Sequence, residues 1–111
     1  MKVSIIIPCY NQAHFLHESI QSALAQTHPD IEVIVVNDGS PDDTSRVVIQ
    51  MIESVKNNIT IILIEKPNGG LSSARNAGIA AATGTYILPL DADDKIHPDF
   101  ITRTIGPDDI V

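Results

Sequence analysis

Basic residues are scarce in this sequence, and their scarcity excludes one large class of partners. Only 7 of the 111 residues are lysine or arginine, and the formal net charge is −7. Proteins that bind nucleic acids hold the phosphate backbone with clustered basic side chains, so we expect no nucleic-acid partner. A phosphate group that binds to so acidic a chain needs a cation between them.

Cysteine and long apolar runs are scarce as well. The single cysteine, Cys9, excludes an internal disulfide and a cysteine metal cluster, and we expect it to be a small buried hydrophobe. No apolar run approaches the roughly 20 residues of a membrane span. Residues 3–7 are too few for the apolar core of a signal peptide. We therefore expect a soluble, cytoplasmic chain, with peripheral membrane association left open for a longer protein.

Short β-branched runs alternate with segments of helical periodicity. Hydrophobic residues make up 43% of the chain, which is enough for the core of one domain. Strands are predicted at residues 3–7, 32–36, 60–64 and 85–88. Their continuous apolar character is typical of strands buried on both faces. Alternation with helices predicts right-handed crossovers and an α/β fold, a Rossmann-like, mostly parallel sheet with flanking helices.

Helices are predicted between and after these strands. Apolar side chains recur on one face of residues 16–24 and of residues 47–55. Residues 40–43 offer Ser40 as an N-cap, a first-turn proline and a capping acid. The segment 71–82 consists largely of small residues, which predicts a helix close to its sheet. A short helix is expected from Phe100 to about Ile105. Residues 110–111 resemble the start of another strand, so we expect residues 1–111 to form one domain that is part of a larger one.

A polar cluster follows each predicted strand. The clusters are residues 8–11, 37–40, 66–70 and 91–94. Ligands of open parallel sheets bind outside the carboxyl ends of the strands, where all four clusters lie. Four polar clusters on one rim predict a ligand site.

The fourth cluster carries three carboxylates within four residues, Asp91, Asp93 and Asp94. Crowded carboxylates repel one another unless a cation lies among them, and hard oxygen ligands suit Mg²⁺ or Mn²⁺. The alternative is a solvated acidic turn.

Other residues in the clusters have two interpretations each. Tyr10 offers a flat face for a base to stack on, or it is ordinary packing. Asp38 could accept the imide N–H of uracil, or it is a turn residue. Gly69 and Gly70 permit close backbone approach to a ligand at a helix N-terminus, or they only form a turn. Arg75 could reach an anion, brace the acidic loop or make a surface ion pair.

Four segments together resemble the ordered motifs of family 2 glycosyltransferases with the A-type fold. They are SIIIPCYN at residues 4–11, VNDGS at 36–40, NGGLSSARNAG at 68–78 and LDADD at 90–94. The resemblance implies an inverting transferase that uses a nucleotide-sugar donor, commonly a UDP-sugar, with Mn²⁺ or Mg²⁺.

The resemblance also implies roles for individual residues. Asp91 would lie near the ribose, and Asp93 would ligate the metal on the diphosphate. Asp38 would hold the base together with the segment from Pro8 to Tyr10. The nucleotide-binding residues implied in this way are Pro8, Cys9, Tyr10, Asn11, Asp38, Gly70, Arg75 and Asp91.

The catalytic base of the family is not found in this sequence. The family's usual base is an acidic residue in a later motif, farther from the acidic loop than the residues that remain after Asp94. Asp99, Asp108 and Asp109 are not in such a context. We therefore expect the base outside residues 1–111 and assign this chain to the donor-binding half, with a carbohydrate, lipid or protein acceptor left open.

Two alternatives remain. One is a nucleotide-sugar-binding fragment without catalysis. The other is a receiver-like signalling domain, which needs an acidic pair after the first strand, where this chain has PCYN at residues 8–11. If the chain is the donor-binding half, with or without catalysis, an uncovered sheet edge would favour a homo-oligomer.

Overall fold

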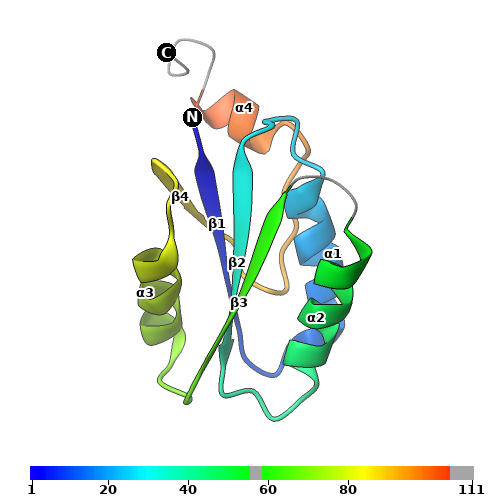
Figure 1. Cartoon of the computed structure of the whole chain (residues 1–111), viewed down its shortest axis with the longest axis vertical. Helices are drawn as coiled ribbons and strands as arrows, with labels where there is room; N and C mark the ends of the chain where they lie inside the picture. Colours follow the sequence, from blue (N-terminus) through cyan, green and yellow to red (C-terminus); the bar gives the residue numbers. More distant parts are fainter. Residues whose placement is uncertain (56–58, 106–111) are drawn as a thin grey trace.

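Four strands alternate with four helices in the computed structural model, which describes residues 1–55 and 59–105 (Figure 1). The elements are β1 (Val3–Cys9), α1 (Ala13–Leu24), β2 (Ile31–Asp38), α2 (Thr44–Ser54), β3 (Thr60–Lys66), α3 (Leu71–Ala81), β4 (Tyr86–Pro89) and α4 (Phe100–Ile105). Each predicted strand is present. The first three extend two residues beyond their predicted ends, which places Cys9, Asp38 and Lys66 on the strands themselves.

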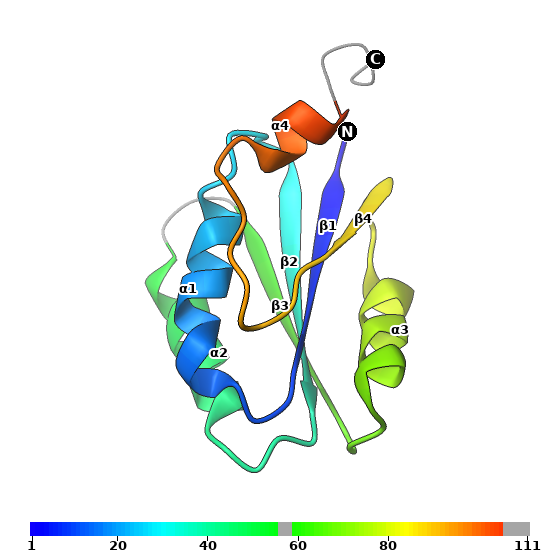
Figure 2. The same ribbon diagram turned by 180° about the vertical axis from the view of Figure 1, so that it is seen from behind.

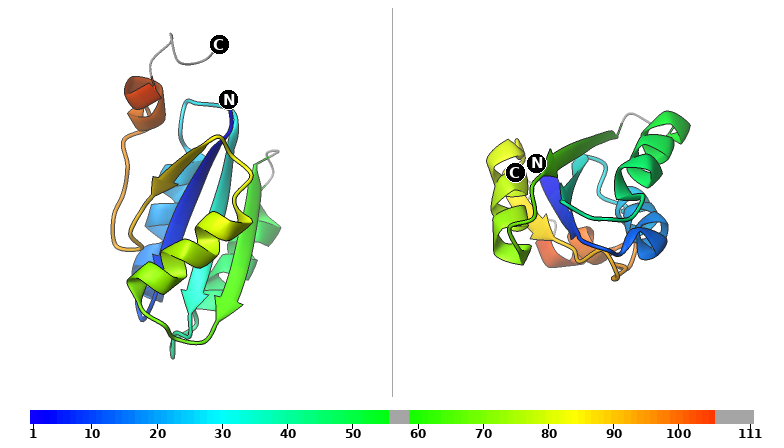
Figure 3. Two further views of the ribbon diagram at one scale, coloured as in Figure 1. Left: turned by 90° about the vertical axis from the view of Figure 1, so that its left-hand side faces the viewer. Right: turned by 90° about the horizontal axis from the view of Figure 1, so that it is seen from below.

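The strands form one parallel sheet in the order β3-β2-β1-β4. Helix α3 covers one face of the sheet, and α1 and α2 lie together on the other face (Figures 1 and 3). The predicted Rossmann-like α/β fold, a mostly parallel sheet with flanking helices, is therefore confirmed. No helix in the described part of the chain has the length and apolar character needed to cross a membrane.

The hydrophobic core has a larger and a smaller part, one on each face of the sheet. The larger part joins β1 and β2 to α1 and α2, with Leu16, Ile20 and Val48 fully buried. The smaller part lies under α3 and consists of Ile6, Ile34, Val36 and Ala74. Both central strands are thus buried on both faces, as predicted.

The prediction of two-sided burial is wrong for the two edge strands. Strand β3 is mostly half-buried, and on β4 the side chains of Tyr86 and Ile87 are 40% and 39% exposed. Each of these strands has a sheet neighbour on one side only within the described residues. Self-association through such an edge remains a prediction.

Helix α3 lies close to the sheet because it carries small residues. A Cβ atom at Gly78 would lie 2.5 Å from Ile6 Cγ2 and 3.2 Å from Val36 Cγ2. A real Cβ atom does not tolerate the shorter distance, so any side chain there would push the helix outward. The predicted close packing of residues 71–82 is confirmed.

The start of α2 differs from the prediction. The helix begins at Thr44, so Ser40 is not its N-cap. Instead, Asp42 accepts hydrogen bonds from the amide of Thr44 at 3.2 Å and from the amide of Ala13 at 3.0 Å. Because one carboxylate binds the first turns of both α1 and α2, residues 40–43 form a turn that joins the two helices. The strand predicted at residues 110–111 lies outside the described residues.

After β4 the chain turns and returns along α1 to the opposite end of the sheet, where α4 lies (Figure 2). Gln26, near the end of α1, donates to the carbonyl of His97 at 2.8 Å and accepts from the amide of Ile101 at 3.1 Å. These bonds hold α4 at the amino ends of the strands. The carboxyl ends are consequently left open.

Candidate functional site

A cleft of about 350 Å³ lies at the carboxyl ends of the strands. Its lining comes from the polar cluster after each of the four strands, as the sheet topology requires. The lining residues are Pro8, Cys9, Tyr10, Gln12, Asp38, Asn68, Gly70, Leu71, Ala74, Asp91, Ala92 and Asp93. Of the nucleotide-binding and metal-binding residues that the resemblance implies, all line this cleft except Asn11 and Arg75. Gly69 and Asp94, which the sequence also suggests, lie outside its lining.

The end of β1 contributes one exposed and one buried side chain. Tyr10 is 50% exposed and lines the cleft, which leaves its ring accessible to a ligand. Cys9 is buried, and its Sγ atom lies 3.5 Å from Thr44 Oγ1. Burial raises the pKa of the Cys9 thiol, which keeps the sulfur protonated and a poor nucleophile. The expectation of a small buried hydrophobe is confirmed.

Asn11 lies beside the cleft, outside its lining. Its backbone has a φ of 55°, a conformation that asparagine tolerates better than most residues. Its amide donates a hydrogen bond to Ser40 Oγ at 2.8 Å. Asn11 therefore joins the loop after β1 to the loop after β2.

Asp38, at the end of β2, is the most heavily hydrogen-bonded carboxylate in the cleft. Its Oδ1 accepts from Lys66 Nζ at 2.8 Å and from the Gly69 amide at 3.0 Å. Its Oδ2 accepts from the Gly70 amide at 3.0 Å and from Asn68 Nδ2 at 3.4 Å. The bond from Lys66 is the strongest influence and lowers the pKa of Asp38, with burial acting against it. The amides of Gly69 and Gly70 thus face Asp38, and Gly70 still lines the cleft.

Lys66 and Asn68 were not singled out from the sequence. In the parallel register of β2 and β3, Lys66 is the residue opposite Asp38. Asn68 also donates to the backbone carbonyl of Asp38 at 3.0 Å. Gly39, with a φ of 66°, makes room for this contact, since a Cβ atom there would lie 2.5 Å from the Asn68 nitrogen. The one signal in the sequence is that both residues belong to the polar cluster at 66–70, which follows the apolar run at 60–64.

The acidic loop after β4 forms the other end of the site. One carboxylate oxygen from each of Asp91, Asp93 and Asp94 lies within 4.8 Å of the other two. The Asp94 amide donates to the Asp91 carbonyl at 3.0 Å, which closes the turn. Asp93 and Asp94 are exposed, so small rotations can bring their oxygens to a common point. This all-oxygen donor set fits Mg²⁺ or Mn²⁺.

Arg75 contacts the acidic loop. Its Nη2 donates to Asp91 Oδ1 at 3.0 Å. Its Nε is buried and has no hydrogen-bond partner among the described residues. Together with Asp91, Asp94 and Lys95, Arg75 lines a second cavity of about 250 Å³. The contact with Asp91 is an ion pair between two partly exposed side chains, which fits both a brace for the loop and a surface ion pair. Contact of Arg75 with an anion stays a prediction.

The remaining acidic candidate near the C-terminus is far from the cleft. Asp99 precedes α4, at the amino ends of the strands, and its carboxylate lies 3.8 Å from Arg103. Asp108 and Asp109 lie outside the described residues. Within the described chain, the carboxylates that line the cleft are those of Asp38, Asp91 and Asp93.

Sequence comparison decides the family. A model of glycosyl transferase family 2 matches residues 4–109, which include all four polar clusters. This chain belongs to glycosyl transferase family 2. The receiver-like alternative is thereby removed.

Relatives of this family 2 chain share both its sequence and its A-type fold. It is 50% identical over 101 residues to the uncharacterized glycosyltransferase EpsJ of Bacillus subtilis, covering 91% of this chain and 28% of EpsJ. It is 31% identical to S. aureus TarS 1-349 in complex with UDP-GlcNAc, with a TM-score of 0.79, covering 94% of this chain and 30% of TarS. It is 28% identical to the mannosyltransferase PcManGT of Pyrobaculum calidifontis in complex with GDP-Man and Mn²⁺, with a TM-score of 0.86. That match covers 93% of this chain and 31% of PcManGT. The family 2 chain thus spans less than a third of the length of these relatives.

Proposed function

We propose that this chain is the donor-binding part of an inverting glycosyltransferase that uses a UDP-sugar and Mn²⁺ or Mg²⁺. The observation that carries the proposal is the cleft itself. It has an exposed aromatic ring and a buried carboxylate at one end and, at the other, the carboxylates of Asp91 and Asp93, with that of Asp94 beside them. A nucleoside diphosphate needs this order of contacts: a base site, a ribose site and a cation for the diphosphate.

At the base end, Tyr10 offers a ring for stacking and Asp38 offers an acceptor for the imide N–H of uracil. Base stacking on an aromatic ring contributes about 1–3 kcal/mol. Pro8 and Cys9 complete this end as apolar walls, and Gly70 allows close approach of the ligand to the backbone.

At the acidic end, Asp91 faces the ribose and Asp93 ligates the cation. Arg75 supports the nucleotide indirectly, because it fixes Asp91. A bound Mn²⁺ or Mg²⁺ would neutralise the charge that develops on the departing diphosphate. The complexes of TarS with UDP-GlcNAc and of PcManGT with GDP-Man and Mn²⁺ support donor and metal use of this kind.

Residues 1–111 would form one nucleotide-sugar-binding domain, the first part of a larger catalytic domain. In the transfer step, an acceptor oxygen forms a bond to the anomeric carbon as the bond from that carbon to the diphosphate breaks on the opposite face. The acceptor proton passes to a carboxylate base, which we place outside this chain. A cytoplasmic location stays an expectation from the sequence.

The direct test is calorimetric titration of the chain with UDP in Mn²⁺ and then in EDTA. We expect binding to depend on the metal, because an acidic chain repels the diphosphate without a cation between them. Asp93→Asn should weaken binding in Mn²⁺ and change little in EDTA. Asp99→Asn, which removes the same charge at the opposite end of the sheet, is the matched control. Equal affinity in Mn²⁺ and EDTA would refute the metal bridge.

A second candidate function is donor binding without transfer, which the absence of a base candidate in the described cleft favours for this chain alone. A general base is worth about 10²–10⁴-fold in rate. We expect a radiolabelled UDP-sugar assay against a panel of acceptors to show transfer by a longer polypeptide that continues beyond residue 111 and negligible transfer by residues 1–111. Comparable turnover by both would place the base within this chain.

A further inference from the structure

We infer that Lys66 is a positioning residue for the base end of the cleft. It acts through Asp38, whose carboxylate it holds in the one orientation that presents Oδ2 to the ligand. This inference rests on the proposed function, since it concerns how the same site recognises the base.

The partners of the two Asp38 oxygens come from different sides. Oδ2 is bound by Gly70 and Asn68, and both of these residues line the cleft. Oδ1 is bound by Lys66 and Gly69, and neither lines it. Oδ2 is therefore the oxygen on the ligand side, and Oδ1 is the anchored oxygen.

The remaining acceptor capacity is also on Oδ2. A carboxylate oxygen has about two lone-pair sites. Both sites of Oδ1 are filled at 3.0 Å or less. Oδ2 has one good bond from Gly70 and one long contact, 3.4 Å, from Asn68. Asn68 can release that contact without losing its partner, because its Nδ2 also donates to the Asp38 carbonyl at 3.0 Å. An N–H group of a ligand can therefore take its place.

Lys66 is itself well fixed for this role. It lies opposite Asp38 in the sheet, its side chain is 19% exposed, and its Nζ also donates to the Pro67 carbonyl at 2.7 Å. Its positive charge also keeps Asp38 ionised and so an acceptor. Without Lys66, the buried carboxylate loses its strongest partner on Oδ1 and is free to turn that oxygen toward other donors.

The experiment is a double-variant cycle on UDP binding in Mn²⁺, with Lys66→Met and Asp38→Asn made singly and together. We expect Lys66→Met to weaken UDP binding about 10-fold in the parent background and less than 2-fold in the Asp38→Asn background, because its effect passes through the carboxylate. Lys66→Arg, which keeps the charge and a donor, should restore affinity to within about 3-fold.

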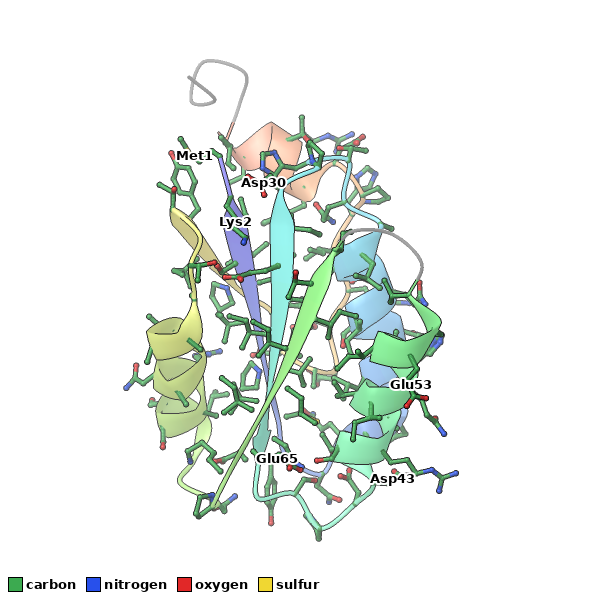
Figure 4. The ribbon with its side chains drawn as sticks, in the orientation of Figure 1. Met1, Lys2, Asp30, Asp43, Glu53 and Glu65 are labelled. Carbon is green, nitrogen blue, oxygen red and sulfur yellow. The ribbon has the colours of Figure 1, made fainter. Side chains whose placement is uncertain are left out.

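Lys2→Met is the matched control. Lys2 lies at the amino end of the sheet, 3.8 Å from the buried Glu32 on the same strand as Asp38, so this variant removes an equal charge from a comparable pair away from the cleft (Figure 4). It should bind UDP like the parent.

Three results would overturn the inference. A folded Lys66→Met variant, verified by circular dichroism, could bind UDP as well as the parent does. Equal losses in both Asp38 backgrounds would show that Lys66 acts on the nucleotide directly. If the Lys66→Met variant does not fold, the inference is overturned when the Lys66→Arg variant binds UDP as weakly as the Asp38→Asn variant does. A parent chain that binds no UDP at all would instead refute the proposed function, and this inference with it.

Discussion

Strand β2 carries a buried carboxylate near each end, and only one of them belongs to a site. Glu32 is 2% exposed at the amino end, and Asp38 is 3% exposed at the carboxyl end. Each has a lysine beside it, and each accepts backbone amides from a segment that flanks α3. Glu32 accepts from the hydroxyl of Ser4 and from the amide and hydroxyl of Thr83.

The difference lies in what surrounds the carboxylate. The hydrogen bonds to Glu32 fasten the segment between α3 and β4 to the sheet, and Glu32 does not line the cleft. The hydrogen bonds to Asp38 fasten the glycine loop and leave one oxygen at the wall of the cleft. Burial and satisfied hydrogen bonds therefore do not distinguish a structural carboxylate from a binding one. An open acceptor position beside a cavity does.

The largest expected effect is on stability, at the amino end. Glu32→Ala leaves the Ser4 hydroxyl and the Thr83 amide without their acceptor, and each such loss costs about 1–3 kcal/mol. We expect the free energy of unfolding in urea to fall by about 2–4 kcal/mol, with UDP affinity of the folded fraction unchanged. Glu53→Ala, on the exposed face of α2 (Figure 4), should change stability by less than about 0.5 kcal/mol. A large loss of affinity in folded Glu32→Ala would mean that the two ends are coupled.

The next effect is on affinity, at the carboxyl end. Asp38→Ala removes the acceptor for the base, and the loss of a charge-assisted hydrogen bond should weaken UDP binding by roughly 1.5–3 kcal/mol. Calorimetry with UDP and CDP is the measurement, because cytosine has an acceptor where uracil has its N–H. Unchanged affinity for both nucleotides would make Asp38 a carboxylate of the same kind as Glu32.

The smallest effect is the response to acid, which the two ends should share. Burial tends to raise the pKa of Glu32, but the bonds from Ser4 and Thr83 outweigh it, so its pKa is lowered, as is that of Asp38. Burial also acts against ionisation of Asp42, but bonds from Ser40, Thr44 and the Ala13 amide lower the pKa of that carboxyl to about 2.

A carboxyl group with a lowered folded-state pKa stabilises the fold above its unfolded pKa and loses that contribution as pH falls through the folded value. Asp42 should therefore contribute about 2 kcal/mol to the free energy of unfolding above roughly pH 4, and this contribution should disappear toward pH 2. Urea unfolding of the parent and of Asp42→Asn between pH 6 and pH 2.5 measures it. If the free energies of unfolding of the parent and of Asp42→Asn change in parallel with pH over that range, ionised Asp42 does not stabilise the fold.

The sequence predicted the strands, their parallel arrangement and the two ends of the cleft, because apolar runs and the residues that follow them are local features. It did not predict the pair formed by Lys66 and Asp38. Strands that are apolar on both faces lack the alternation that would reveal their register, so which residues lie opposite one another could not be inferred. The N-cap at Ser40 was predicted wrongly for a related reason, since Asp42 binds Ala13, which is distant in sequence.

The pairing of β4 with β1 has a consequence for the order in which the site can form. Asp38 and Lys66 meet through neighbouring strands, 28 residues apart, whereas β4 reaches β1 from the far end of the chain, with Tyr86 beside Val3. Closing the longer loop is slower and costs more chain entropy. During synthesis the base end can therefore fold once residues up to about 70 are available, while the acidic end must wait for β4. The cleft is completed only when the chain has returned to the strand with which it began.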